Sequence, residues 1–233
     1  MLNKHHTSLI GLLVTAIILV ALVLVLASTA NGQKPGTTGT EIKAYDRQLA
    51  NGILAVRGHM RWFRNGLGRY RALAYSSAAI QAAGKLVDPI MLLAIAAVES
   101  DFRHWRRANK VDCGICQTRV TVFYRGRAAE RFCQRLLKSP VLSFQYATRE
   151  LTHYRRTYCR KETGWRQTRC VLNTYNQGIK YLKIERCRSE RCKKQARYWI
   201  RVLCFARGIE ERRRPKRDCR KAKSRQWIEK TYN

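Results

Sequence analysis

The sequence predicts a mainly α protein that consists of one helical domain, an apolar N-terminal segment and a basic extension containing cysteines. Segments with helical periodicity and helix-start signals recur through the middle of the chain. No segment shows the apolar and polar alternation of a half-buried strand. A length of 233 residues suits one domain with appendages better than two full domains.

The N-terminal segment is an apolar run at residues 9–27, preceded by a short stub at residues 1–8. As a helix, such a run would span roughly 28 Å, close to the thickness of a bilayer's hydrocarbon core. It predicts a transmembrane anchor or a cleaved signal peptide, and its length favours the anchor. The domain would then lie outside the cytoplasm, on the periplasmic or cell-wall side, and would be secreted if the segment is cleaved. Residues 28–40, rich in Gly, Thr and Ser, are expected to form a flexible linker.

The helical domain begins with an Ala-rich stretch. It covers residues 41–83, and its SSAAIQAAGKL segment, which begins at Ser76, is predicted to be helical up to Gly84, with Gly84 as the C-cap. Asp88 and Pro89 then start an apolar helix, because Asp can cap free backbone amides and proline at the first helical position loses no hydrogen bond. Further helices are expected at residues 127–137, 141–154, 170–181 and 196–205.

Glu99 lies near the end of the apolar helix that follows this cap. Leu92, Ile95 and Ala96 share its helical face, and the other faces are apolar too, so we expect the helix to be central and buried. Burial raises the pKa of a carboxyl group and keeps it protonated near neutral pH, as a general acid requires. The alternative is a glutamate that reaches water or pairs with Arg103.

Four sequence blocks follow one another along the domain: VDPIMLLAIAAVES at residues 87–100, CGICQT at 113–118, SFQYATRELTHY at 143–154 and NTYNQG at 173–178. In kind and in order they resemble the signature of the soluble lytic transglycosylase family, which has a lysozyme-like domain related to goose-type lysozymes. In that family an apolar helix ends in Glu-Ser, and the later blocks read Gly-Leu-Met-Gln-hydroxyl and Ala-Tyr-Asn-Ala-Gly. The resemblance implies such a domain within residues 41–182.

The resemblance also implies roles for single residues. Glu99 would be the lone catalytic acid and base, and the residues that would bind or orient the substrate around it are Ser100, Gln117, Thr118, Tyr175 and Asn176. Family enzymes cleave the MurNAc-GlcNAc β-1,4 bond of peptidoglycan without water. The glutamate protonates the leaving oxygen and then takes a proton from the C6 hydroxyl, which gives a 1,6-anhydro product. We therefore expect neither a cofactor nor a metal.

Two features of the blocks leave alternatives open. Cys116 stands where the family has methionine, and it either pairs with Cys113 or packs as a small apolar thiol, which we favour. Asp101 and Asp112 are the carboxylates nearest to Glu99 in the sequence. Because one of them could activate water, a lysozyme-like hydrolase, such as a phage lysin, is the alternative reaction.

The net charge is +32, and residues 183–233 form a densely basic extension. Such charge attracts polyanions, and in an exported protein we expect anionic wall polymers or lipids to be the partners of the extension. Nucleic acid is not the expected physiological ligand. A non-catalytic protein that binds polyanions or the cell wall on the same fold is the second hypothesis.

The chain contains nine cysteines, all at or after Cys113. In a chain directed out of the cytosol they predict disulfides, and because nine is odd, at least one thiol is free or pairs with another molecule. The sequence does not fix the pairing. A structural zinc site is the weaker interpretation, since no histidine pair stands at ligand spacing.

Overall fold

The structure is a computed structural model of the whole chain, and it describes residues 39–57, 67–107, 109, 111–178 and 198–213. The chain divides into two compact units, Met1–Glu41 and Ile42–Asn233, and the second contains the domain. The apolar run at residues 9–27 and most of the linker lie outside the described residues. Within the described part, no helix has the length and apolar character needed to cross a membrane.

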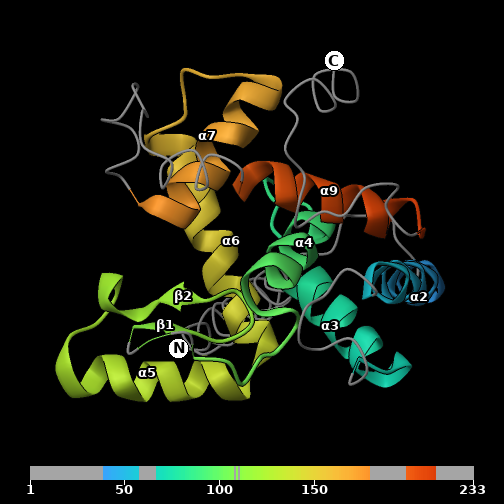
Figure 1. The fold of residues 1–233 in the computed structure, drawn as a ribbon, viewed down its shortest axis with the longest axis horizontal. Helices are drawn as coiled ribbons and strands as arrows, with labels where there is room; N and C mark the ends of the chain where they lie inside the picture. Colours follow the sequence, from blue (N-terminus) through green and yellow to red (C-terminus); the bar gives the residue numbers. More distant parts are fainter. Residues whose placement is uncertain (1–38, 58–66, 108, 110, 179–197, 214–233) are drawn as a thin grey trace, which may run out of the picture. The chain divides into compact units, whose positions relative to one another are not determined.

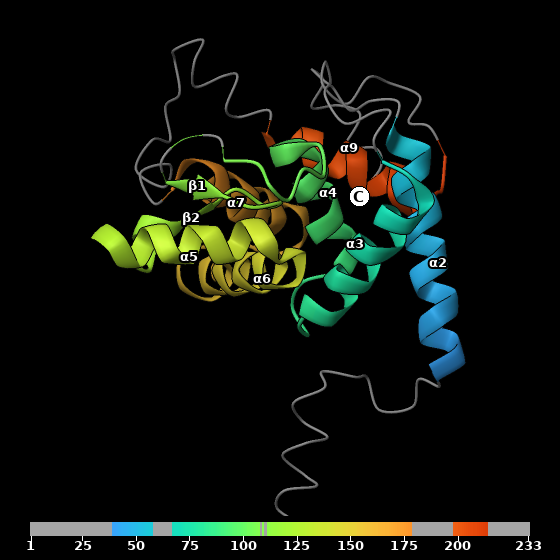
Figure 2. The same ribbon diagram turned by 90° about the horizontal axis from the view of Figure 1, so that it is seen from below.

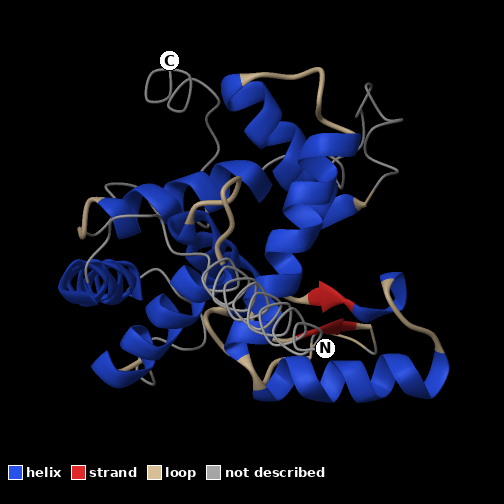
Figure 3. Ribbon diagram, turned by 180° about the vertical axis from the view of Figure 1, so that it is seen from behind, coloured by secondary structure: helices blue, strands red, loops and turns tan. Residues whose placement is uncertain are grey.

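The described part of the second unit is mainly helical, which confirms the predicted class (Figures 1 and 3). Its helices, with the first beginning just before the unit boundary, are α2 (Gly39–Val56), α3 (Arg69–Ala82), α4 (Pro89–Ser100), α5 (Gly126–Lys138), α6 (Pro140–Thr157), α7 (Gly164–Gln177) and α9 (Tyr198–Glu210). A short antiparallel hairpin, β1 (Asp112–Cys113) and β2 (Thr118–Arg119), leads into a 3-10 turn, η2 (Val120–Val122). The sequence did not predict the hairpin, because strands of two residues are too short to show alternation.

Helix α4 forms the centre of the domain. It packs against α9 and α3 and touches α6 (Figures 1 and 2). Leu92, Leu93 and Ile95 are fully buried although they point in different directions around the helix. The prediction that this helix is central and buried is confirmed.

Both ends of α4 are capped, the first by a side chain and the second by the backbone. The Asp88 carboxylate accepts a 2.7 Å hydrogen bond from the Ile90 amide, and Pro89 occupies the first helical position, as predicted. The helix ends at Asp101, which adopts a left-handed conformation and donates its amide to carbonyls of the last turn. The prediction for α3 was wrong, since its C-cap is Ala83 in an extended conformation and not Gly84.

Disulfides connect neighbouring elements of the domain. Cys113 of β1 pairs with Cys133 of α5, and Cys159, just after α6, pairs with Cys170 of α7. Cys204 of α9 is also disulfide-bonded. Cys116 is a free thiol, fully buried in the main core. The interpretation of this residue as a packed thiol is confirmed, and a Cys113–Cys116 bridge is excluded.

Candidate functional site

A groove of about 850 Å³ opens beside the C-terminal end of α4. The hairpin, α6 and the end of α7 supply the rest of its lining, so elements far apart in the sequence meet there. The lining residues are Glu99, Arg106, Asp112, Gln117, Arg119, Val122, Phe123, Arg149, Glu150, His153, Tyr154, Tyr175, Asn176, Gln177 and Gly178. Four of the six residues predicted for the site are among them.

Glu99 reaches the groove from the last turn of α4. The pKa of its carboxyl is raised to about 7, mainly by burial and to a smaller extent by nearby Asp112. The Tyr198 hydroxyl and the charges of Arg201 and Arg106 act in the opposite direction. A carboxyl group with this pKa can both give and take a proton near neutral pH.

Helix α9 contributes two groups next to Glu99 that the sequence did not reveal. The Tyr198 hydroxyl is buried and close enough to lower the pKa of Glu99, yet it has no hydrogen-bond partner of ordinary length among the described residues. The Arg201 Nε atom is likewise buried and unpartnered in the described chain. The sequence placed these residues in the basic extension, whereas α9 packs on α4 within the core.

The Cys113–Thr118 block forms the turn of the hairpin. Gly114 and Gln117 both have positive φ angles, of 78° and 50°. The Gln117 side chain stabilises the turn by donating from Nε2 to the carbonyl oxygens of Gly114 at 2.6 Å and Arg106 at 3.0 Å. Gln117 thus lines the groove with its amide held in a fixed orientation.

Two of the predicted site residues, Ser100 and Thr118, do not line the groove. Ser100 is buried, and its hydroxyl lies 2.7 Å from the Ile115 carbonyl oxygen and 3.1 Å from that of Ala96. It therefore connects α4 to the hairpin turn. Thr118 is also buried, and its Oγ1 has no hydrogen-bond partner among the described residues.

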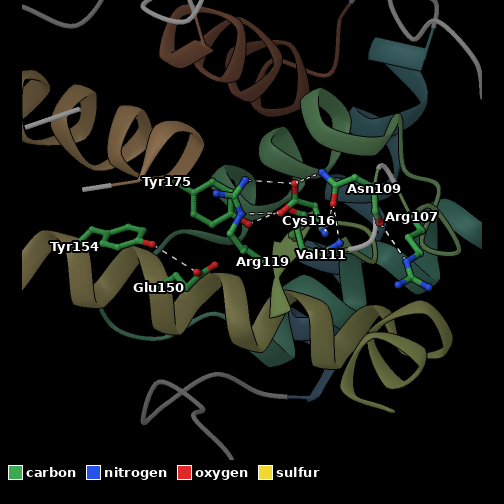
Figure 4. A network of polar contacts seen from close by, with 9 residues as sticks. Arg107, Asn109, Val111, Cys116, Arg119, Glu150, Tyr154 and Tyr175 are labelled. Atoms are coloured by element: carbon green, nitrogen blue, oxygen red, sulfur yellow. Dashed lines mark hydrogen bonds and ion pairs between the residues drawn. The ribbon is translucent and has the colours of Figure 1, made fainter. Parts of the chain in front are cut away.

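The Asn173–Gly178 block supplies the other wall of the groove. The Tyr175 hydroxyl donates a 2.8 Å hydrogen bond to the Cys116 carbonyl oxygen, so the described contact of this tyrosine is with the hairpin turn (Figure 4). Asn176 is exposed and lines the groove next to it. Both residues are available to a ligand at the end of α7.

Asp112 and Asp101, the two carboxylates nearest to Glu99 in sequence, have different positions. Asp112 lines the groove, where both of its oxygens accept hydrogen bonds: Arg119 Nε lies 3.0 Å from Oδ1, and Asn109 Nδ2 lies 2.6 Å from Oδ2. Asp101 caps α4 and is not part of the lining. Of the two, only Asp112 can reach a ligand in the groove.

Glu150 of α6 is a further carboxyl in the groove that sequence reasoning missed. It is 7% exposed, and burial raises its pKa to about 7. The Tyr154 hydroxyl, 3.5 Å away, is its described hydrogen-bond donor (Figure 4). Its signal in the sequence was weak, because Ser143 and Tyr154, which share its helical face, are polar as well.

We find no group of three or more His, Cys, Asp or Glu side chains able to hold a metal ion in the described ranges. The chain matches no known family, and no curated protein and no solved structure matches it either.

Proposed function

We propose that the protein is a peptidoglycan lytic transglycosylase with a lysozyme-like domain, and that Glu99 is its general acid and base. The observation that carries this proposal is the position of Glu99, a carboxyl at the end of a buried helix that opens on a groove of about 850 Å³. A cavity of this size can hold a short stretch of a glycan chain. The neighbouring Gln117 and Tyr175 come from two of the three other blocks that resemble the family signature.

In the proposed reaction the protonated Glu99 gives its proton to the glycosidic oxygen between MurNAc and GlcNAc, and the bond to the MurNAc anomeric carbon breaks. The resulting carboxylate then takes the proton of the C6 hydroxyl, whose oxygen bonds to the anomeric carbon. The product is a 1,6-anhydro sugar. A pKa of about 7 supports this use of one group in both steps, because both protonation states are accessible near neutral pH.

The sequence adds a cellular setting to the proposal. The apolar run at residues 9–27 would anchor the protein in the membrane with the domain on the periplasmic or cell-wall side, or direct its secretion if it is cleaved. The net charge of +32 would favour contact with anionic wall polymers or lipids. Peptidoglycan itself is the proposed substrate, and nucleic acid is not the proposed ligand.

The test is to incubate the full chain, solubilised in detergent, with purified peptidoglycan and to identify the released muropeptides by mass. We expect anhydro products, which are lighter than hydrolysed products by one water. Glu99→Gln should abolish them, whereas Glu130→Gln, on the exposed face of α5, is the matched control and should keep them. Absence of cleavage by the wild type, or equal cleavage by Glu99→Gln, would reject the proposal.

A non-catalytic polyanion-binding function is the second candidate, and the net charge of +32 favours it. Such charge produces salt-dependent binding to DNA and to wall polymers in either case. Binding therefore does not separate the two candidates, and only the absence of peptidoglycan cleavage supports the second.

A further inference from the structure

Glu150 is a buried carboxyl whose surroundings in the chain leave it without a strong partner. It lines the groove although it is only 7% exposed. Its described hydrogen bond, from the Tyr154 hydroxyl, is long at 3.5 Å, and none of the ion pairs in the described part of the chain includes it. Buried carboxyl groups are rarely kept without a partner unless they serve a function. The free side of this group faces a space that a ligand can enter.

Asp112, the third carboxyl of the groove, differs from Glu150 because it has strong hydrogen-bond partners within the chain. Arg119 and Asn109 donate hydrogen bonds to both of its oxygens. Protonation of Asp112 by a ligand would weaken the charge-assisted hydrogen bond that it accepts from Arg119. Among the carboxyls of the groove, Glu99 and Glu150 are therefore the two that can exchange a proton with a bound molecule.

A further polar atom at the groove is left unpaired. Gln177, at the end of α7, lines the groove, and its buried Nε2 atom has no partner in the described chain. Because unpaired buried polar atoms are rare in native proteins, this atom indicates that the site is completed by water or by a ligand.

We propose that Glu150 is a second catalytic carboxyl of this groove, the general base that activates a water molecule against the anomeric carbon. This inference rests on the proposed glycan cleavage by Glu99. In this branch Glu99 gives its proton to the glycosidic oxygen as the carbon–oxygen bond breaks. The water oxygen then bonds to the anomeric carbon, and its proton passes to the Glu150 carboxylate. A hydrolysed sugar leaves alongside the anhydro product, and the carboxyls exchange protons with solvent.

The charges around Glu150 are compatible with this role. The pKa of its carboxyl is raised to about 7, mainly by burial, while Tyr154 and Arg119 oppose this shift and nearby Asp112 adds to it. Glu99 and Glu150 line the same groove as Tyr175, and the charges of both carboxyls raise the pKa of the Tyr175 hydroxyl. A two-carboxyl hydrolysis requires one group protonated and the other ionised, and two buried carboxyls that share one groove can hold a single proton between them in this way.

The test compares the full-length wild type, Glu150→Gln and Glu99→Gln on purified peptidoglycan, and measures hydrolysed and anhydro ends separately by mass. We expect the wild type to release both, and Glu150→Gln to lose the hydrolysed ends by about 100-fold or more while it keeps the anhydro ends. Glu99→Gln should lose both. A purely structural role of Glu150 would lower the two products together, so the ratio of products reports the chemistry.

The outcomes separate this inference from the proposed function. If the wild type releases only anhydro ends, or if Glu150→Gln keeps its hydrolysed ends, the role of Glu150 is rejected while the transglycosylase proposal stands. If the wild type releases neither product, both fail. If only hydrolysed ends form and Glu150→Gln abolishes them, the role of Glu150 as the general base is confirmed. The transglycosylase proposal is then rejected in favour of a hydrolase. Should Glu150→Gln not fold, Glu150→Asp replaces it, and an unchanged ratio of products rejects the role.

Discussion

The Tyr175 hydroxyl and the Cys116 carbonyl oxygen are joined by a 2.8 Å hydrogen bond across 59 residues of sequence. This contact fastens the end of α7 to the hairpin turn that carries Gln117. The Ser100 hydroxyl donates to the Ile115 carbonyl, 2.7 Å away in the same turn, and so fastens the end of α4 there as well. Three sequence blocks that are far apart along the chain therefore meet at one turn, and the groove forms beside it.

Replacing Tyr175 with Phe should lower both stability and activity. The ring would still fill its place, but the Cys116 carbonyl would lose its described donor, which costs about 1–3 kcal/mol for a buried group. The turn would then be held less firmly beside Glu99. Urea denaturation and peptidoglycan cleavage measure the two effects. Tyr70→Phe is the control, because that side chain is 91% exposed, and equal behaviour of the two variants would contradict the prediction.

Replacing Gly114 with Ala should destabilise the hairpin turn. A Cβ atom there would lie 2.9 Å from the Ser143 hydroxyl and 3.1 Å from the Leu136 carbonyl oxygen, on a residue with a φ of 78°. The matched control is Gly126→Ala, at a φ of 53° with no atom within 4 Å of the added carbon. Both variants have the backbone strain, and only Gly114→Ala adds the collision, for a further loss of about 1–3 kcal/mol in unfolding free energy. Equal urea midpoints would refute this.

The features that could be predicted from the sequence are those that depend on residues close together along the chain. The Asp88-Pro89 start and the apolar faces of α4 depend on residues a few positions apart, and the partly buried position of Glu99 follows from them. The hairpin could not be predicted from the sequence, because its strands are two residues long and depend on pairing across a turn. Glu150 was missed for a related reason, since its role depends on the groove that the hairpin and α7 build over α6.

Helix α9 shows how composition can conceal a core element. Its neighbours along the chain are strongly basic, and we therefore predicted a helix at residues 196–205 within a basic extension outside the domain. In the structure Trp199, Val202 and Phe205 are buried, and the helix packs on α4. The closeness of Tyr198 to Glu99, about 100 residues earlier, is a tertiary contact that no local pattern encodes.

Cys116 should resist alkylation in the folded protein. Its thiol is fully buried, and burial raises its pKa well above the ordinary value, so the reactive thiolate is suppressed. Iodoacetamide at about pH 8 should leave the peptide that contains Cys116 unmodified until urea unfolds the chain. Peptide mass mapping with and without urea makes the measurement. Modification of this peptide at the same rate in the native protein would show that the thiol is accessible.

The ionisation of Glu99 should make the free energy of unfolding depend on pH. Burial raises its pKa from the ordinary 4.5 to about 7 in the folded state, while in the unfolded chain it ionises near 4.5. Ionisation is therefore penalised only in the folded state, and the folded protein loses stability as the pH rises from 4.5 through 7. Asp112 strengthens this effect, whereas Tyr198, Arg201 and Arg106 weaken it.

Glu99→Gln removes the ionisation and should become more stable relative to the wild type as the pH rises through this window. Urea denaturation of both proteins from about pH 4 to about pH 8.5 measures the difference in unfolding free energy. Glu150 titrates in the same range, but it is present in both proteins and cancels in the difference. Cleavage by the wild type should decline above about pH 7 as the acid form of Glu99 is lost. A stability difference that stays constant with pH would mean that Glu99 is as well solvated in the folded protein as in the unfolded chain.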